Sequence, residues 1–186
     1  KQHLELTRDI AKKFNNDYKL EDFFPVVEPL IPKETSRVMS LRDGKKKMSK
    51  SEDSDQSRIN LKDDKDLISQ KIRKAKTDNE PIPSEINGLK NRYEALNLIS
   101  IYGSINEIEI SKVLKEFGGK NFSTFKSKLS DSIIERICPI GDEIKKLLDD
   151  KPYLNKILEE GSKRADLIAT NNLKEIYKIV GLTKFT

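Results

Sequence analysis

Apolar residues recur every three to four positions over much of this chain, which is the spacing of one face of an α-helix. The first such stretch runs from Lys1 to Phe14 and is followed by Asn15 and Asn16, which predicts a first helix of about four turns. From Asp63 the helical spacing returns and continues almost to the C-terminus. The pattern therefore predicts a mainly α protein.

The C-terminal two thirds of the chain is divided by turn signals into several amphipathic stretches. Asp63 or Asp64 is placed to cap the first of them, and Gly118 and Gly119 are expected to end another in a left-handed C-cap. The stretch 93–102 is apolar on nearly all sides, which predicts a central buried helix. The predicted stripes are Leu67, Ile68, Ile72 and Ala75; Leu96, Leu98, Ile99 and Ile101; Ile110, Val113, Leu114 and Phe117; Phe125, Leu129, Ile133 and Ile137; Ile144, Leu147 and Leu148; Leu154, Ile157 and Leu158, extending towards Leu167, Ile168 and Ala169; and Leu173, Ile176, Tyr177 and Val180.

The helical pattern is interrupted between the first helix and Asp63. Three prolines in 23–32 favour short extended pieces and exclude a long helix there. Next, 37–41 is predicted to pair with 45–48 as a hairpin, with Asp43 and Gly44 supplying the positive-φ positions of a tight turn.

Composition narrows the classes of function only a little. The 186 residues are 35% hydrophobic, enough for one or two compact units. Lys and Arg outnumber Asp and Glu by 36 to 31, a mild excess that fits either an acidic partner such as RNA or ordinary solubility. Cys138 is the single cysteine, which excludes a disulfide framework and favours the cytoplasm, and no apolar run reaches the roughly 20 residues of a membrane span. One cysteine and one histidine do not make a zinc site, so no metal-ligating residues are predicted.

The stretch Gly-Lys-Lys-Lys-Met-Ser-Lys-Ser at 44–51 places ammonium and hydroxyl groups on a loop right after the predicted strand 37–41. Lys47 and Lys50 lie three residues apart, so both can reach one polyphosphate, while Ser49 and Ser51 can donate neutral hydrogen bonds. Charge alone would equally fit a solvated basic turn. The order of the residues favours phosphate binding.

Residues 47–51 read Lys-Met-Ser-Lys-Ser, the KMSKS motif of class I aminoacyl-tRNA synthetases, and their flanks resemble the bacterial tryptophan-specific family. The resemblance includes Arg-Val-Met-Ser-Leu at 37–41 and Lys-Ile-Arg-Lys-Ala-Lys-Thr-Asp at 71–78, and continues through 93–102, 122–139 and 165–182. Tyrosine enzymes usually differ in these flanks. The chain is thus identified as similar to the C-terminal half of tryptophanyl-tRNA synthetases.

This resemblance implies an enzyme that activates L-tryptophan with ATP to an adenylate, with Mg2+ shared among the phosphates, and transfers it to tRNA(Trp). By the resemblance, Lys47 and Lys50 are catalytic, stabilising charge on the departing pyrophosphate. Glu52 stands where the family often has Asp directly after the motif, which keeps the charge. The implied ATP-binding residues are Val38, Lys47, Met48, Ser49, Lys50 and Ser51.

The resemblance also implies a division of the chain at 57/58. Residues 1–57 would be the C-terminal portion of a Rossmann-type (α/β) catalytic domain with the KMSKS loop, and 58–186 a helical bundle that binds the tRNA anticodon region. The HIGH-like motif and the indole-binding carboxylate belong to the family's N-terminal half, so this fragment alone is expected to be inactive. The full-length protein is expected to be a cytoplasmic homodimer.

Two questions remain open at the level of sequence. The basic cluster Lys71, Arg73, Lys74 and Lys76 fits contact with RNA phosphates, and equally a solvated helix face. The alternatives for function are another class I synthetase, such as the tyrosine enzyme, and a non-catalytic helical module that binds tRNA or other RNA.

Overall fold

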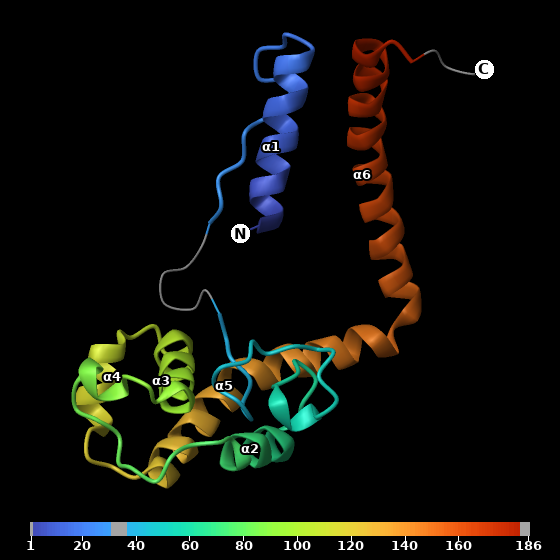
Figure 1. Ribbon diagram of the computed structural model, residues 1–186. Coiled ribbons are helices and arrows are strands. Elements are labelled where there is room, and N and C mark those ends of the chain that lie inside the picture. Colours follow the sequence, from blue (N-terminus) through green and yellow to red (C-terminus); the bar gives the residue numbers. More distant parts are fainter. Residues whose placement is uncertain (1, 31–36, 183–186) are drawn as a thin grey trace. The chain divides into compact units, whose positions relative to one another are not determined.

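The computed structural model describes residues 2–30 and 37–182, and these form a mainly helical structure, as the periodicity predicts (Figure 1). The described residues contain no β-strand, only an isolated antiparallel bridge between Met39 and Lys47. The elements are α1 (Gln2–Asp17), the short 3-10 helix η1 (Asp55–Ser57), α2 (Lys65–Lys74), the 3-10 helix η2 (Ile86–Leu89), α3 (Tyr93–Ile105), α4 (Ile110–Phe117), α5 (Phe122–Asp149) and α6 (Lys151–Val180).

The chain forms two compact units, one of residues 1–31 with 150–186 and one of residues 32–149. The hairpin region that precedes residue 58 thus belongs to the same compact unit as α2–α5. The functional division at 57/58 and the Rossmann-type assignment of 1–57 stay predictions.

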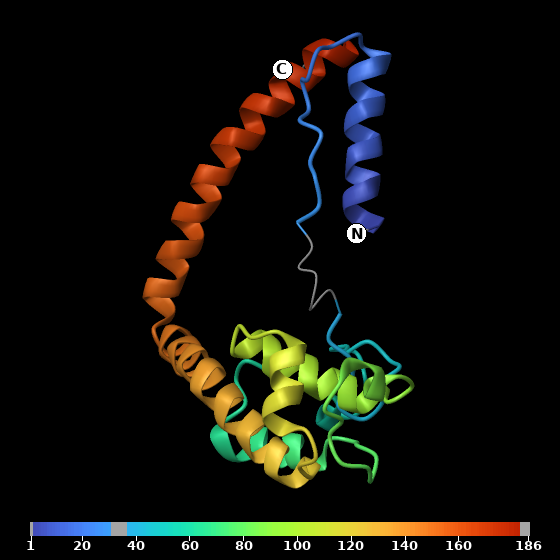
Figure 2. The same cartoon turned by 90° about the vertical axis from the view of Figure 1, so that its left-hand side faces the viewer.

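The unit 32–149 has one apolar core, in which α2, α3 and α4 pack against or beside α5 (Figures 1 and 2). The stretch predicted as a central helix is α3, with Ala95, Leu98 and Ile99 fully buried. Tyr102 of α3 meets Phe117 and Phe125 at ring-centroid distances of 5.2 and 5.5 Å. Aromatic pairs of this kind stabilise the fold by about 0.5 to 1.5 kcal/mol each, beyond the contribution of the apolar area that they bury.

Two predicted helix ends are confirmed in detail. The side chain of Asp64 caps α2 by accepting a hydrogen bond of 2.8 Å from the Leu67 N–H, so of the two candidate aspartates Asp64 is the cap. After α4, Gly119 has φ of 77°, the left-handed conformation expected at that position.

The prediction of separate helices after residue 122 is wrong. The stripes assigned to 125–137 and 144–148 lie in the single helix α5, which continues through Pro139, and the last two stripes lie in the single helix α6. Proline removes one helical hydrogen bond but does not have to end a helix that tertiary packing holds on both sides. Gly141 supplies such packing, since a Cβ on it would lie 2.5 Å from the Leu61 carbonyl oxygen.

In the other unit, α1 extends to Asp17, three residues beyond the predicted end at Phe14. The buried Asn15 belongs to the helix, and its side-chain amide donates to the Phe24 carbonyl (3.0 Å) and accepts from the Phe24 N–H (3.1 Å). These bonds fold the next segment back on α1, where Phe14 contacts Phe24 at a centroid distance of 4.9 Å.

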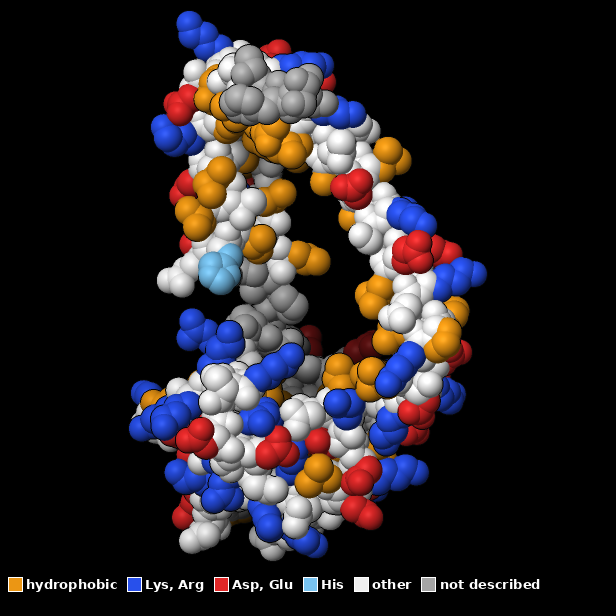
Figure 3. Space-filling view, turned by 90° about the vertical axis from the view of Figure 1, so that its right-hand side faces the viewer, with side chains coloured by type: hydrophobic (Ala, Val, Ile, Leu, Met, Phe, Trp, Pro, Cys, Tyr) orange, Lys and Arg blue, Asp and Glu red, His pale blue; other side chains and the backbone are white. Residues whose placement is uncertain are grey.

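Helix α6 ends at Val180, and Gly181, whose φ is 75°, is its left-handed C-cap. Apolar side chains stand exposed along it, among them Leu158, Leu167 and Ile168 (Figure 3). Within the described part of the chain, none of the helices combines the length and the apolar character needed to cross a membrane.

Candidate functional site

The predicted hairpin is present, but its two arms, which lie within the described residues, are joined by a single antiparallel bridge and form no β-strand. The Ser40 N–H donates to the Lys46 carbonyl (2.8 Å) and the Met48 N–H donates to the Val38 carbonyl (3.0 Å), around the bridge between Met39 and Lys47. The predicted pairing of 37–41 with 45–48 is therefore confirmed. It brings Val38 and Met48 together at the base of the loop that follows.

The turn of this hairpin differs from the prediction. Among the described residues, only Gly119 and Gly181 are glycines with positive φ, so Gly44 does not adopt that conformation, and neither does Asp43. Asp43 instead closes the turn with its own groups, because its carbonyl accepts from the Lys46 N–H (3.1 Å) and its carboxylate from the Lys45 N–H (3.0 Å). Gly44 is required for space: a Cβ on it would lie 2.5 Å from the backbone nitrogen of Glu94, at the start of α3.

The loop opens onto a cleft of about 760 Å³ within the unit 32–149, which we call the hairpin cleft. Val38, Lys47, Met48, Ser49 and Lys50 all line it. Ser51 does not, but its hydroxyl lies 2.9 Å from the Ser49 hydroxyl and its N–H donates to that oxygen (3.3 Å). The remaining lining residues are Arg37, Arg58, Ile59, Asn60, Leu61, Lys62, Ile144 and Leu148.

Among the described residues, the charged lining of the cleft is cationic. Arg37, Lys47, Lys50, Arg58 and Lys62 line it, and no carboxylate of the ranges 2–30 and 37–182 does. Lys47 and Lys50 are exposed and form no ion pair with a carboxylate of the described ranges 2–30 and 37–182. Two ammonium groups without counter-ions beside an apolar wall are suited to a polyanion with a flat apolar group attached, as in a nucleotide.

Three of these cations, Arg37, Arg58 and Lys62, are not among the site residues that the sequence predicts. Arg37 lies at the start of the hairpin, and Lys62 lies just before the helix cap Asp64. None of the three belongs to the motif at 47–51. Only the fold of the unit 32–149 brings them to the same cleft as Lys50.

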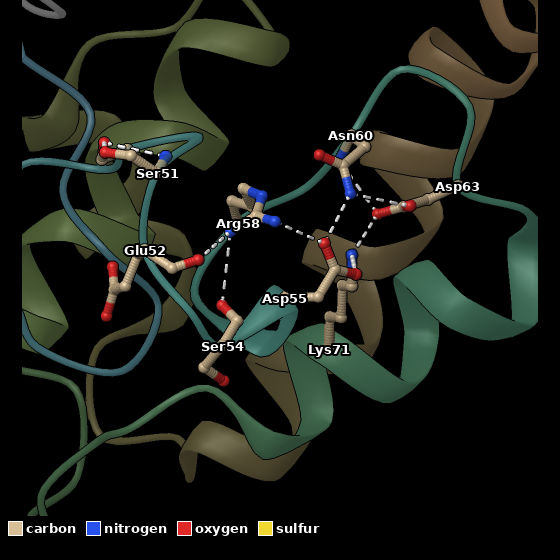
Figure 4. A network of polar contacts seen from close by, with 9 residues as sticks. Ser51, Glu52, Ser54, Asp55, Arg58, Asn60, Asp63 and Lys71 are labelled. Carbon is tan, nitrogen blue, oxygen red and sulfur yellow. Dashed lines mark hydrogen bonds and ion pairs between the residues drawn. The ribbon is translucent and has the colours of Figure 1, made fainter.

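Behind the loop lies a network of charged residues that the sequence did not indicate (Figure 4). The Lys71 ammonium, on α2, is 2.6 Å from Asp55 and 2.6 Å from Asp63. Arg58 lies 3.0 Å from Asp55, and the Asn60 side chain donates to both Asp55 (2.9 Å) and Asp63 (3.2 Å). The hydrogen bond from Lys71, followed by that from Asn60, lowers the pKa of Asp55 below its ordinary value.

The burial of Lys71 corrects the predicted basic cluster. Its side chain is 0% exposed and bound to two carboxylates, so it cannot contact RNA. Lys76 is exposed but pairs with Glu94 at 3.1 Å. Of the four residues, only Arg73 and Lys74 are exposed with no ion pair to a described carboxylate. The part of the cluster that remains available to a phosphate is therefore this pair.

No group of three or more His, Cys, Asp or Glu side chains among the described residues is arranged to hold a metal ion. The described polar lining of the hairpin cleft consists of five cations, the Ser49 hydroxyl and the Asn60 amide. A divalent ion at this cleft would therefore find no carboxylate ligand among the described residues.

Comparison with known proteins identifies relatives of the whole chain. The family of class I tRNA synthetases (W and Y) matches residues 1–137. The chain is 48% identical over 98% of its length to a tryptophan–tRNA ligase of Mesorhizobium japonicum, and 47% identical over 97% to one of Brucella melitensis. It covers 56% of each of those proteins, so it spans about half the length of the curated relatives it matches.

Solved structures give the same result. The tryptophanyl-tRNA synthetase of Mycoplasma pneumoniae superposes with a TM-score of 0.80 at 26% identity, over 98% of this chain and 56% of that one. The enzyme of Campylobacter jejuni, solved with ADP and tryptophan, superposes with a TM-score of 0.64 at 26% identity, over 97% of this chain and 54% of that one. The resemblance to tryptophanyl-tRNA synthetases, first indicated by the motif at 47–51, is thus confirmed over nearly the whole chain.

Proposed function

Because this chain belongs to the class I tRNA synthetases for tryptophan and tyrosine, we propose that the protein activates L-tryptophan with ATP and transfers it to tRNA(Trp). The observation that carries the proposal is the position of Lys47 and Lys50, which face the hairpin cleft with no carboxylate partner in the described part of the chain. Tryptophan is preferred to tyrosine because the relatives at 46–48% identity are tryptophan–tRNA ligases.

The first chemical step is the attack of a tryptophan carboxylate oxygen on the α-phosphorus of ATP. The new oxygen–phosphorus bond forms as the bond to the bridging oxygen breaks, and the leaving pyrophosphate takes that electron pair. Lys47 and Lys50 stabilise the negative charge that grows on the pyrophosphate, and they can do so without first breaking ion pairs. Pre-formed donors of this kind lower the barrier because no reorganisation is needed when the charge develops.

The nucleoside end of ATP is proposed to lie at the base of the hairpin. Val38 and Met48 are joined there by the hydrogen bond from the Met48 N–H to the Val38 carbonyl, and both line the cleft. Their side chains and the Ser49 hydroxyl offer an apolar surface with a polar edge, which suits a purine. The likeness to a synthetase solved with ADP supports a nucleotide at this position.

The described residues of the cleft do not form a Mg2+ site of their own. Mg2+ prefers oxygen ligands, chiefly carboxylates and phosphates, and none of the described lining residues carries a carboxylate. A Mg2+ ion would therefore arrive with ATP, held by phosphate oxygens, and no step of this proposal depends on where it lies.

The proposal is tested by tryptophan-dependent exchange of labelled pyrophosphate into ATP, measured on the complete protein. Exchange with tryptophan and not with tyrosine is expected. Exchange only with tyrosine would assign the protein to the other branch of the family, and tRNA binding without exchange for either amino acid would make it a non-catalytic RNA-binding module.

The role of Lys50 is tested by Lys50→Ala, which should slow exchange about a hundred- to a thousandfold, as expected when one pre-formed transition-state donor is lost. Lys46→Ala is the matched control, because Lys46 lies in the same hairpin, is exposed, and does not line the cleft. A Lys50→Ala rate within twofold of the Lys46→Ala rate would contradict the catalytic role.

In the second step the terminal adenosine of tRNA(Trp) takes the tryptophanyl group from the adenylate, and AMP leaves. We assign the helical region 58–186 to binding of the tRNA, with Arg73 and Lys74 as phosphate contacts, and 1–57 to the catalytic domain. The homodimer is part of the same proposal and is tested by the mass of the complete protein in solution.

A further inference from the structure

The segment 49–54, which we call the Lys50 loop, is tied to the rest of the unit from behind by one side chain. Arg58 donates from Nη1 to the carbonyl of Glu52 (2.8 Å) and to that of Ser54 (3.5 Å). Its Nη2 lies 3.0 Å from the Asp55 carboxylate. A planar guanidinium that binds three groups of one short segment restricts the path of that segment.

Asp55 links Arg58 to helix α2, because its carboxylate binds both Arg58 and Lys71. One Asp55 oxygen faces Arg58 and Asn60, and the other lies 2.6 Å from the Lys71 ammonium. Lys71 is in turn held by the buried Asp63, which also accepts from the Asn60 N–H (2.9 Å). The Lys50 loop is therefore connected to a helix of the apolar core through charge-assisted hydrogen bonds (Figure 4).

Arg58 lines the hairpin cleft together with Lys47 and Lys50, but its two terminal nitrogens are engaged with the protein itself. Its side chain is only 16% exposed, and both terminal nitrogens bind protein oxygens. Lys47 and Lys50 have no such partners in the part of the chain that the structure describes. The three cations thus divide into two that are free to bind a ligand and one that holds the backbone.

We propose that Arg58 is a positioning residue of the synthetase reaction: by holding the Glu52 and Ser54 carbonyls and the Asp55 carboxylate, which Lys71 of α2 also binds, it keeps Lys50 facing the hairpin cleft before ATP binds. The inference rests on the proposed function, because it assigns Arg58 a role in the action of Lys50. It differs from a direct role, in which Arg58 would itself bind the phosphates.

The two roles are separated by a double-mutant cycle in pyrophosphate exchange on the complete protein. Arg58→Ala alone should lower kcat/KM for ATP about ten- to a hundredfold, since a displaced catalytic group loses its alignment. In the Lys50→Ala background the same change should have an effect of less than about twofold, because Arg58 acts through Lys50. An undiminished effect in that background would overturn the proposal and make Arg58 a direct ligand.

Loop order gives a second readout that needs no catalysis. Hydrogen exchange of the amides of 49–54, measured without nucleotide, should be faster in Arg58→Ala and in Arg58→Lys, since lysine lacks the planar fork. Asp55→Asn should act in the same direction. Lys46→Ala is the control and should exchange like the wild type. Unchanged exchange in Arg58→Lys and Asp55→Asn would overturn the proposal even if Arg58→Ala failed to fold.

The two measurements also separate this inference from the proposed function. If the wild-type protein exchanges no pyrophosphate with either amino acid, the proposed function fails. If it exchanges pyrophosphate but the loop amides do not respond to Arg58, only the positioning role fails.

Discussion

The side chain of Asn97 forms two hydrogen bonds with the backbone of Met39, a residue 58 positions earlier in the chain. Its amide oxygen accepts from the Met39 N–H at 3.0 Å, and its amide nitrogen donates to the Met39 carbonyl at 2.9 Å. Asn97 lies on α3 and is 6% exposed, so the first arm of the hairpin is fixed to the buried helix of the core. The side chain replaces the strand neighbour that Met39 would have in a sheet.

We expect Asn97→Ala to destabilise the protein by about 1 to 3 kcal/mol, because both Met39 backbone groups would lose their partners. Urea unfolding measures the change. Asn79→Ala is the control, since Asn79 is exposed and makes no side-chain hydrogen bond within the described ranges. Equal midpoints for the two variants would show that the hairpin does not depend on Asn97.

The close contact at Gly44 predicts opposite effects for two glycine-to-alanine changes. At Gly44 the new Cβ would lie 2.5 Å from the Glu94 nitrogen, so Gly44→Ala should destabilise by about 1 to 3 kcal/mol. At Gly161, inside α6, no atom lies within 4 Å of the added Cβ, so Gly161→Ala should stabilise by up to about 1 kcal/mol through helix propensity. Thermal unfolding of both variants measures the difference. A neutral or stabilising Gly44→Ala would refute the steric explanation.

The ion pair of Asp78 with Arg92 predicts a pH dependence of stability. Arg92 Nε donates to Asp78 at 2.8 Å and Nη2 lies 2.5 Å from its other oxygen, and these bonds lower the pKa of Asp78. Because the folded pKa lies below the unfolded value of about 3.9, the stabilisation is complete above that value and is lost as pH falls through the folded pKa.

Asp78→Asn should therefore lower stability near neutral pH by about 1 kcal/mol, the size expected of a partly exposed pair. The difference from the wild type should vanish in acid, where Asp78 is protonated. Urea unfolding at a series of pH values measures this. Asp53→Asn, at a residue without an ion pair or hydrogen bond in the described part of the chain, is the control. A difference that persists unchanged in strong acid would contradict the role of the charge.

The exposed pair Arg73 and Lys74 predicts how RNA binding responds to salt. The double variant Arg73→Ala with Lys74→Ala should weaken binding of tRNA(Trp) and reduce the slope of log affinity against log salt by about 1 to 2. With fewer phosphates neutralised, binding of the RNA releases fewer counter-ions. Pyrophosphate exchange should stay near the wild-type rate.

Lys112→Ala with Lys115→Ala removes the same charge from α4 of the same compact unit and serves as the control. The salt slope is measured by titrating tRNA(Trp) at several salt concentrations. Identical slopes for the two double variants would assign Arg73 and Lys74 to a solvated surface.

The sequence by itself determined the features that depend on neighbouring residues. Helical periodicity located the buried faces of α2 and α4 and the position of the central helix α3, although Leu96 of the set predicted for α3 is 38% exposed. A short acidic side chain before α2 identified Asp64 as one of two candidate caps, and Gly119 marked the end of α4. The pairing that brings Val38 to Met48, and the motif that includes Lys50, were also visible, because a hairpin joins residues close in the chain.

Tertiary structure alone decided the features that depend on distant segments. A lysine at position 71 has the same local pattern whether it faces solvent or two carboxylates, and only the fold brings Asp55 and Asp63 to it. Likewise Pro139 reads as a helix breaker until Gly141 is seen against the Leu61 carbonyl, and Arg58 reads as a surface cation until its nitrogens are seen on the Lys50 loop. The physical reason is that burial and ion pairing depend on distance in space, which local periodicity does not encode.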